Sequence, residues 1–337
     1  MSFEIVARPH QDNFLQWAAD KPEVVVLSAD LTNSCEVGVF RDAYPDRFYS
    51  MGMAEQNMLS VAAGMAREGL EPWLHTFSVF LYRRPLDQLQ MSVAYPALPV
   101  RLVGFLPGIT TPGGVTHQAI EDIAVLRAVP NMTILEVGDA TEVESVIDVA
   151  HTIDGPVYIR QLRGEVSRIF PKEEPMVLNS ARKLSSGTDV ALMTSGIMTE
   201  EALRALPLIT QRGVSVDHLH ISTLKPFTDP AVLESMSRVS KGVITMENHS
   251  IVGGLGSAVA EVMAENGVGA KLSRIGIPDT YAHGASQKYL MAELGLDARA
   301  LVTRVEQAVG ESLNITDEEL TEARIVDVHS SAKAEAL

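Results

Sequence analysis

One carboxylate in the sequence lies among apolar residues. Glu55 belongs to the stretch RFYSMGMAEQNMLSVAAGMAREG (47–69), whose small and apolar residues otherwise predict a buried turn that leads into a buried helix. Ionising a carboxyl group there is costly, because burial favours the neutral form. Glu55 is therefore either an acid that handles a proton or a charge at the start of a helix, where the helix dipole favours it.

Two further segments carry side chains suited to binding or catalysis. In HTFSVFLYRR, Phe77 and Phe80 are three residues apart, so one helical turn would place both rings on one side of a cleft. The alternative is that both rings belong to the core. PGITTPGGVTHQAIED is a glycine-rich loop that ends near His117, and loops over a rigid sheet commonly carry functional residues.

Polar residues also follow two predicted strands. SADLTNS places Asp30 and Ser34 after the first long strand, at the edge where open α/β sheets bind ligands, although an ordinary capped turn has the same pattern. VYIRQLRG places Arg160 at the end of another strand. Its planar guanidinium could bind a phosphate or a carboxylate, or it could form an internal ion pair.

Composition excludes several classes of protein. Acidic residues outnumber basic ones by 43 to 27, and the net charge of −16 disfavours nucleic acid and anionic membrane surfaces as partners. Cys35 is the only cysteine, so no internal disulfide can form, and no His/Cys spacing indicates zinc. The N-terminal residues do not resemble a signal peptide, and no apolar run is long enough to span a membrane. A soluble protein of the reducing cytoplasm is expected.

The order of the segments predicts an α/β protein of two domains with parallel or mixed sheets. Short β-branched runs alternate with helical patterns over residues 1–165, as in a parallel sheet covered by helices. Residues 166–187, rich in proline, charge and serine, are expected to form a linker. A second, smaller alternation occupies residues 188–310, and an acidic extension occupies residues 311–337.

Taken together and in this order, the segments resemble the C-terminal two-thirds of transketolase, namely its pyrimidine-binding domain followed by its C-terminal domain. The resemblance covers almost the whole chain. It rests on the SADLTNS loop, the GMAEQN turn, the paired phenylalanines, the THQ loop with LRAVPNMTIL after it, the RQ strand, and TLKPF with ENHSIVGGLGSAV.

The resemblance implies a fold of the thiamine-diphosphate enzyme type and a role for each cofactor residue. Glu55 would hydrogen-bond a ring nitrogen of the aminopyrimidine and so let the cofactor deprotonate its own thiazolium carbon. Phe77 and Phe80 would pack on the pyrimidine, where stacking fixes its orientation. Asp30 would lie near the thiazolium.

The family also implies substrate contacts. Arg8, Ser34 and Arg160 would hold the sugar phosphate, and His117 would be a catalytic residue near the reacting carbonyl and hydroxyl groups.

Two positions depart from the family pattern. Gly113 replaces an aspartate that reads a substrate hydroxyl, and Phe105 replaces a histidine of the phosphate end. An altered substrate, such as a branched sugar phosphate or a sulfonated sugar, would account for both changes.

The family's N-terminal domain, which binds the cofactor diphosphate and Mg²⁺, has no counterpart in this sequence. The resemblance therefore implies the C-terminal subunit of a split transketolase, of which the apulose-4-phosphate type is an example. A separate subunit would supply the Mg²⁺ ligands, and none is assigned to this chain. The dimeric symmetry of the family would give an α2β2 assembly.

Other functions remain open at this point. GMAEQN is close to the pattern of 1-deoxyxylulose-5-phosphate synthase, whereas RQL after the strand is nearer to transketolase. A β-subunit of a 2-oxoacid dehydrogenase is a further alternative, against which the THQ loop argues. The chain could also be a regulatory subunit that has lost catalysis, although Glu55, Phe77, Phe80 and His117 are all present.

Overall fold

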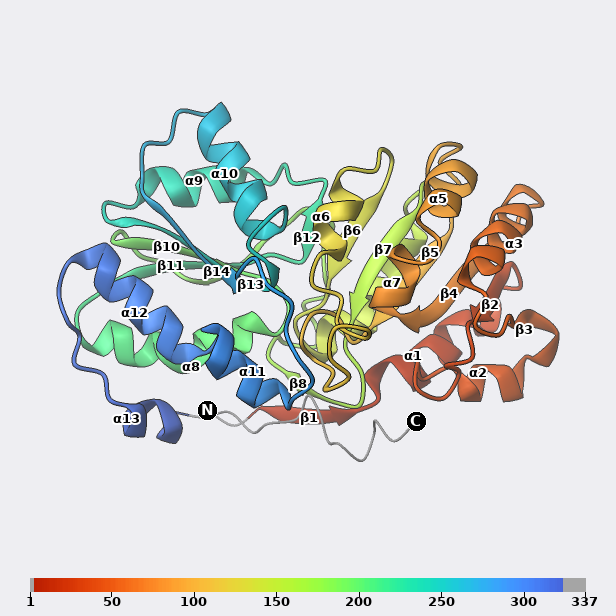
Figure 1. Cartoon of the computed structure of the whole chain (residues 1–337), viewed down its shortest axis with the longest axis horizontal. Helices are drawn as coiled ribbons and strands as arrows, with labels where there is room; N and C mark the ends of the chain where they lie inside the picture. Colours follow the sequence, from red (N-terminus) through yellow and green to blue (C-terminus); the bar gives the residue numbers. More distant parts are fainter. Residues whose placement is uncertain (1–2, 324–337) are drawn as a thin grey trace.

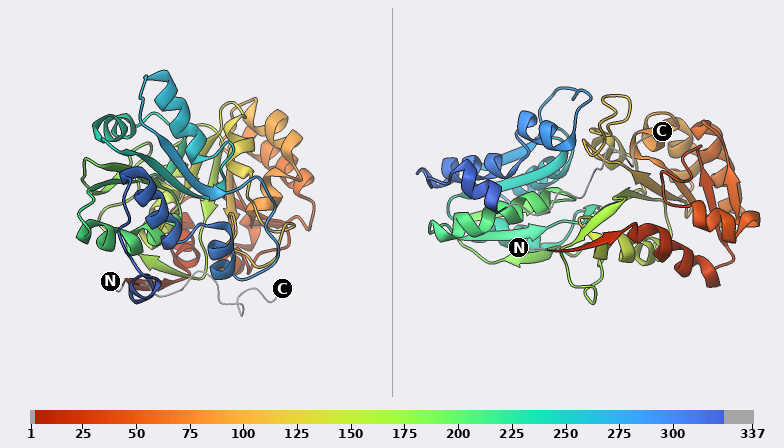
Figure 2. Two further views of the ribbon diagram at one scale, coloured as in Figure 1. Left: turned by 60° about the vertical axis from the view of Figure 1, so that its left-hand side comes forward. Right: turned by 90° about the horizontal axis from the view of Figure 1, so that it is seen from below.

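The structure, a computed structural model, describes residues 3–323 and contains two α/β domains that lie side by side (Figure 1). The predicted fold class is confirmed, since parallel strands dominate both main sheets. Figure 2 shows the same two bodies from two further directions. Among the described residues, no helix has both the length and the apolar character needed to cross a bilayer.

The first domain is built on a seven-stranded sheet. Its strands, in spatial order, are β12 (Thr223–Lys225), β6 (Thr133–Glu136), β7 (Val157–Gln161), β5 (Arg101–Phe105), β4 (Glu71–Phe77), β2 (Val24–Ser28) and β3 (Phe48–Ser50). All neighbours are parallel except β12 and β6, which run antiparallel. Every residue of β2, β4, β5 and β7 is buried, as expected for parallel strands covered on both faces.

Helices and short helical turns cover this sheet, with α3 and α5 above it and α1 and α2 below it in Figure 1. The helices are α1 (Pro9–Trp17), α2 (Gly38–Ala43), α3 (Glu55–Arg67), α4 (Ser78–Tyr82), α5 (Leu86–Gln88), α6 (Asp122–Arg127) and α7 (Ala140–His151). The turns are η1 (Ala18–Asp20), η2 (Pro45–Arg47) and η3 (Leu89–Ala94). The helix α3 begins at Glu55, so the acid predicted in a buried turn is the first residue of a helix.

The second domain has a five-stranded sheet in the order β14 (Leu272–Ile277), β13 (Gly242–Ser250), β10 (Val190–Thr194), β11 (Val216–His220) and β9 (Arg182–Ser185). In Figure 1, α9 (Pro230–Arg238) and α10 (Leu255–Glu265) lie above this sheet. The helices α8 (Met198–Gln211) and α12 (Ala298–Val309) lie below it. The remaining helices are α11 (Gln287–Leu294) and α13 (Asp317–Glu322).

The segment expected to be a linker also contains strand structure. The strand β8 (Glu165–Arg168) pairs antiparallel with β1 (Glu4–Ala7), and β9 forms an edge of the second sheet. These two strands are polar, because an edge strand needs little burial, and their composition therefore does not identify them as strands. The helix α13 lies in the acidic extension, and residues 324–337 of that extension lie outside the described residues.

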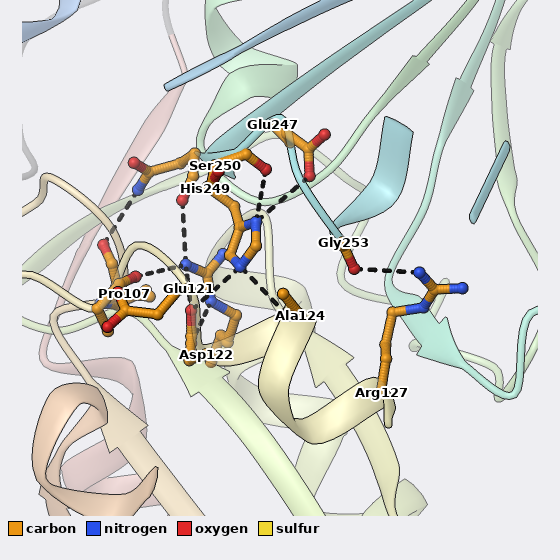
Figure 3. Close-up of polar contacts among 12 residues, drawn as sticks. Pro107, Glu121, Asp122, Ala124, Arg127, Glu247, His249, Ser250 and Gly253 are labelled. Carbon is orange, nitrogen blue, oxygen red and sulfur yellow. Dashed lines mark hydrogen bonds and ion pairs between the residues drawn. The ribbon is translucent and has the colours of Figure 1, made fainter. Parts of the chain in front are cut away.

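A buried group of charges joins the two domains, and we call it the Arg160 cluster; Figure 3 labels its members Asp122, Glu247 and His249. Arg160 Nε donates to Asp122 Oδ2 at 2.9 Å, and Arg160 Nη1 donates to Glu136 Oε1. Arg160 Nη2 donates to the carbonyl of Asn248, in β13 of the second domain, at 3.0 Å. Burial opposes the charge, but Asp122 and Glu136 raise the pKa of Arg160 further above its ordinary value.

The same cluster contains His249 and Glu247 from β13. Figure 3 shows His249 between Glu247 and Asp122, with its Nε2 accepting from the Ala124 amide at 3.3 Å. Burial lowers the pKa of His249 to about 4, so the ring is neutral at pH 7. Burial raises the pKa of Glu247 to about 8, even though its carboxyl accepts the first amides of α10.

A second buried contact between the domains is centred on Glu142 at the start of α7. Its carboxylate accepts from His220 Nε2 at 2.9 Å, Ser222 Oγ at 2.5 Å and Arg182 Nε at 3.1 Å. Burial alone would raise the pKa of Glu142, but His220 and the hydrogen bonds hold it at about 2. The interface therefore depends on matched charges as well as on apolar packing.

Replacing Arg160 should strongly destabilise the protein. Arg160→Met leaves Asp122 and Glu136 buried without their cation, which typically costs about 3–5 kcal/mol. Arg41→Met is the matched control, because Arg41 pairs with the exposed Asp42 at the surface, and such pairs contribute about 0–1 kcal/mol. Urea unfolding measures both variants. Equal, small losses would contradict the central position given to Arg160.

Candidate active site

Most of the predicted site residues come from the carboxyl ends of neighbouring strands, in the order β7, β5, β4, β2 and β3, whereas Arg8 follows β1 of the two-stranded sheet. Phe77 is the last residue of β4, Asp30 follows β2, and Glu55 follows β3. The loop that carries His117 follows β5. Because these strands are parallel, all of these residues lie at one edge of the sheet, where α/β folds bind ligands.

Glu55 is buried, with a side-chain exposure of 3%, and it has one charged partner. Arg84, just beyond α4, donates from Nη1 to Glu55 Oε1 at 2.5 Å. The guanidinium carbon of Arg84 also lies 3.9 Å from the centre of the Phe80 ring. The carboxylate and the aromatic ring therefore contact the same planar group.

Phe77, Phe80 and His117 form one aromatic group. The two phenylalanine rings are nearly parallel, at 23°, with their centres 6.0 Å apart. The His117 ring approaches both edge-on, at 6.3 Å from Phe77 and 5.5 Å from Phe80. His117 Nδ1 is 2.8 Å from the Thr116 hydroxyl. The contact between the two phenylalanine rings is also compatible with the alternative that they are core residues. Both rings, however, face a histidine that is only half-buried.

Gly113 lies against His117. A Cβ atom at Gly113 would come within 2.8 Å of His117 Cβ and 2.9 Å of His117 Cγ. Any side chain there, including the aspartate of the family pattern, would require the histidine to move. The change to glycine and the present position of His117 are therefore physically linked.

The loop with His117 is held from both domains. From the first domain, Arg83 forms two hydrogen bonds of 2.8 Å with the Glu121 carboxylate and donates to the Val115 and Gln118 carbonyls. From the second, Asn248 accepts from the Ile109 amide and donates to the Pro107 carbonyl, both at 3.0 Å. Both ends of the loop are thus fixed.

Arg8 and Ser34 lie with Arg163 and Glu36 in one group, which we call the Arg163 group. Arg163 Nη1 donates to the Ser34 carbonyl at 3.0 Å, and its guanidinium lies 5.5 Å from the Phe77 ring centre. The amide of Arg8 donates to the Gly164 carbonyl at 2.6 Å, and the amide of Gly164 donates to Glu36 Oε1 at 2.6 Å. Arg163 therefore brings one cation close to the aromatic group, and the Arg8 main chain is tied to the same segment through Gly164.

Arg160 does not lie in this group, so its placement gives no support to the expectation that it holds a substrate phosphate. Its side chain has no exposed surface, and its nitrogens bind Asp122, Glu136 and the carbonyls of Ala119 and Asn248. A strand-end arginine faces either the ligand edge or the domain interface, and here it faces the interface. Arg163, three residues further along, lies beside Phe77, as Arg84 lies beside Phe80.

Phe105, which replaces a histidine of the family pattern, is also fully buried. It packs in a cluster with His10 and His75, at ring-centre distances of 5.5 and 6.3 Å. His10 Nε2 and His75 Nε2 are 3.1 Å apart, and burial lowers the pKa of His75 to about 3. Both histidines are therefore neutral core residues.

Sequence reasoning missed Arg84, Arg163 and Glu36. Arg84 lies four residues after Phe80 and Arg163 lies three after Arg160, so proximity in the sequence was a usable signal for both. Glu36 had no signal in the sequence. In the structure Arg8, Asp30, Glu36 and Leu106 all have positive φ, between 48° and 63°, a backbone conformation that clusters at functional sites.

One further group has the composition of a metal site. Oxygen and nitrogen atoms of Glu23, Glu71 and His151 all lie within 4.8 Å of one another. Glu71 already accepts from Arg101 Nε at 2.9 Å and contacts His151 Nδ1 at 2.7 Å. Glu71 begins β4, so this group lies at the opposite edge of the sheet from Phe77, and the adjacent guanidinium disfavours a cation there.

The parallel-dominated sheets, with charged and aromatic residues at one sheet edge, define the class of an α/β protein with a ligand-binding edge. Two domain profiles match the chain: the transketolase pyrimidine binding domain over residues 10–168 and the transketolase C-terminal domain over residues 179–301. The chain therefore belongs to the transketolase family.

Three relatives extend this comparison. The chain is 39% identical over 292 residues to 6-deoxy-6-sulfo-D-fructose transketolase subunit SqwH of Clostridium sp. (strain MSTE9), a match that covers 86% of this chain and 90% of the relative. It is 36% identical over 297 residues to 1-deoxy-D-xylulose-5-phosphate synthase of Chlorobium phaeovibrioides, a match that covers 86% of this chain but 46% of the synthase. A solved structure of a split gene transketolase, an inactive beta4 tetramer, superposes with a TM-score of 0.81 and 35% identity, covering 90% of this chain and 97% of that one.

Glu36 should make the stability of the protein depend on pH. Burial raises the pKa of Glu36 to about 7, although Gly164, Arg8 and Arg163 act in the opposite direction. The folded state therefore keeps a proton that the unfolded state releases near pH 4.5. The free energy of unfolding falls as the pH rises from there, until the folded state also loses the proton near pH 7. Glu36→Gln removes this loss and keeps an acceptor for the Gly164 amide.

We therefore expect Glu36→Gln to gain on the order of 2–3 kcal/mol relative to the parent between pH 5 and pH 8.5. Urea unfolding at the two pH values gives the difference. Glu68→Gln, at an exposed position, is the control and should run parallel to the parent. A parallel profile for Glu36→Gln would show that Glu36 is ionised throughout this range.

Proposed function

We propose that this chain is one subunit of a thiamine-diphosphate-dependent transketolase that transfers a two-carbon ketol unit between sugar phosphates. A separate subunit would bind the diphosphate and Mg²⁺ and complete the site. The observation that carries the proposal is the buried Glu55 carboxylate beside the Phe80 ring, with a planar cation bound to both. An aminopyrimidine requires this environment, in which a carboxyl group can hydrogen-bond a ring nitrogen and an aromatic side chain can stack on the ring.

The residues of the chain fit the pyrimidine end of thiamine diphosphate. Glu55 would share a proton with a ring nitrogen, since its apolar setting strengthens that hydrogen bond. Phe77 and Phe80 would hold the plane of the ring, and Asp30 would lie toward the thiazolium. When bound, thiamine diphosphate supplies the nucleophilic carbon of the reaction.

The substrate would lie between His117 and the Arg163 group. His117 would hydrogen-bond the reacting oxygens, because it stands at the edges of both phenylalanine rings. Arg8, Ser34 and Arg163 would hold the charged end of the sugar, with Arg163 replacing Arg160 in this role. The sulfo-sugar in the name of the clostridial relative supports a sulfonate as an alternative to a phosphate at this end.

The partner subunit would cover the surface beside Glu55. Exposed apolar side chains gather on the elements around α3: Met53 is 77% exposed, Tyr95 is 80% exposed and Met91 is 58% exposed. Such side chains are typical of a surface that is covered in an assembly. An α2β2 arrangement follows from a symmetric pair of these half-sites.

A second candidate is a fragment of the 1-deoxyxylulose-5-phosphate synthase type, which the 36% identity to that enzyme supports. The match covers less than half of the synthase, so a partner would be needed there as well. A screen of ketose donors against 2-oxoacid donors, made on the reconstituted complex, separates the two reactions.

The isolated chain should be inactive and should bind thiamine diphosphate with Mg²⁺ weakly, because it has only the pyrimidine half of the site. Calorimetry on this chain alone, and then with a co-purified partner, tests this. Binding and ketol transfer should appear only in the mixture. Micromolar binding or turnover by this chain alone would overturn the split-subunit proposal.

Glu55→Gln should abolish cofactor activation while preserving the fold, since glutamine keeps the size of the side chain but cannot share a proton in the same way. General acid–base groups typically contribute about 10²–10⁴-fold. The measurement is deuterium exchange at the thiazolium carbon in the reconstituted complex, which requires no sugar. Exchange at the parental rate, with equal cofactor binding, would limit Glu55 to a structural role at the start of α3.

A further inference from the structure

Arg84 makes two contacts that the proposed cofactor would also need. It donates to Glu55 Oε1 at 2.5 Å, and its guanidinium carbon lies 3.9 Å from the centre of the Phe80 ring. Phe77 lies beside Phe80 in a nearly parallel orientation, and His117 meets it edge-on. Arg84 is the group that covers a face of the Phe80 ring at stacking distance.

A guanidinium and an aminopyrimidine share the relevant chemistry. Both are planar and both stack on an aromatic ring; the guanidinium donates in-plane N–H groups to a carboxylate, and the pyrimidine presents an in-plane ring nitrogen that shares the proton of a carboxyl group. A ligand that stacks on Phe80 and bonds to Glu55 would therefore meet Arg84 in its place. The two cannot occupy that position together.

We propose that Arg84 is an internal substitute for the aminopyrimidine: it occupies the pyrimidine position in the free chain and leaves when the cofactor binds. The inference rests on the proposed function, which requires a pyrimidine at Glu55. Beyond that function, Arg84 competes with the aminopyrimidine for Glu55 and Phe80. The affinity for the cofactor is therefore reduced by the free energy needed to displace Arg84.

The surroundings of Arg84 allow this exchange. Its side chain is 44% exposed, so water can replace the contacts that it gives up. Its backbone carbonyl accepts from Gln56 Nε2 at 3.2 Å, which holds the main chain while the side chain turns. In the free chain the pair has a clear physical purpose, because an unpaired carboxylate buried as deeply as Glu55 would be costly.

The test uses the isolated full-length chain and the hydroxymethyl-aminopyrimidine half of thiamine as the probe. Arg84→Met removes the charge and the hydrogen bond and keeps an unbranched side chain. We expect this variant to bind the probe on the order of ten-fold more tightly than the parent, as measured by NMR titration. Arg41→Met is the matched control, since the Arg41 side chain has a similar exposure of 43%, and it should leave the affinity unchanged.

A second measurement follows the Arg84 side chain directly. NMR of the guanidinium nitrogens of Arg84 should show hindered rotation in the parent and free rotation in Glu55→Gln. Adding thiamine diphosphate to the reconstituted parent complex should free the group in the same way.

The outcomes separate this inference from the proposed function. If the complex binds thiamine diphosphate but Arg84→Met binds the probe no more tightly than the parent, or more weakly, the inference is wrong and the function stands. If neither chain binds the probe and the complex does not bind thiamine diphosphate, both are wrong.

Discussion

The ion pairs of the Arg160 guanidinium with Asp122 and Glu136 are the interaction on which the rest of the structure depends. The guanidinium lies without exposure between Asp122 at the start of α6, Glu136 at the end of β6 and the Asn248 carbonyl of β13. A buried cation of this kind contributes little net stability when matched, but its removal is severe because each partner then remains charged in an apolar place. Together with the Glu142 contact, Arg160 and its acceptors therefore fix how the two domains sit against each other.

The second domain has a physical task at the candidate site even though it supplies none of the predicted site residues. Asn248 holds the start of the His117 loop through Pro107 and Ile109, and the Ser250 amide donates to the Ile120 carbonyl near its end at 2.8 Å. A glycine-rich loop has a high conformational entropy when unfolded, so its order has to come from such contacts. The second domain keeps His117 against the phenylalanine rings.

Much of the fold could be predicted, because buried parallel strands have a composition of their own. VVVLS and VALMT are apolar and β-branched, and both are central strands. The edge strands β8, β9 and β12 were not predicted, since their residues are polar and their pairing partners lie far away in the sequence. Strand β12 even joins the sheet of the other domain.

The sequence by itself determined the local part of the site. Glu55, Phe77, Phe80 and His117 lie in short motifs, and a motif encodes the turn that presents its residue. Only the tertiary structure decided what each charge contacts. Arg160 and Arg163 are three residues apart, yet one is buried between domains and the other lies by Phe77, while Arg84 binds Glu55 across 29 positions. The reason is that the partner of a charge is chosen by packing between distant segments, which no local pattern records.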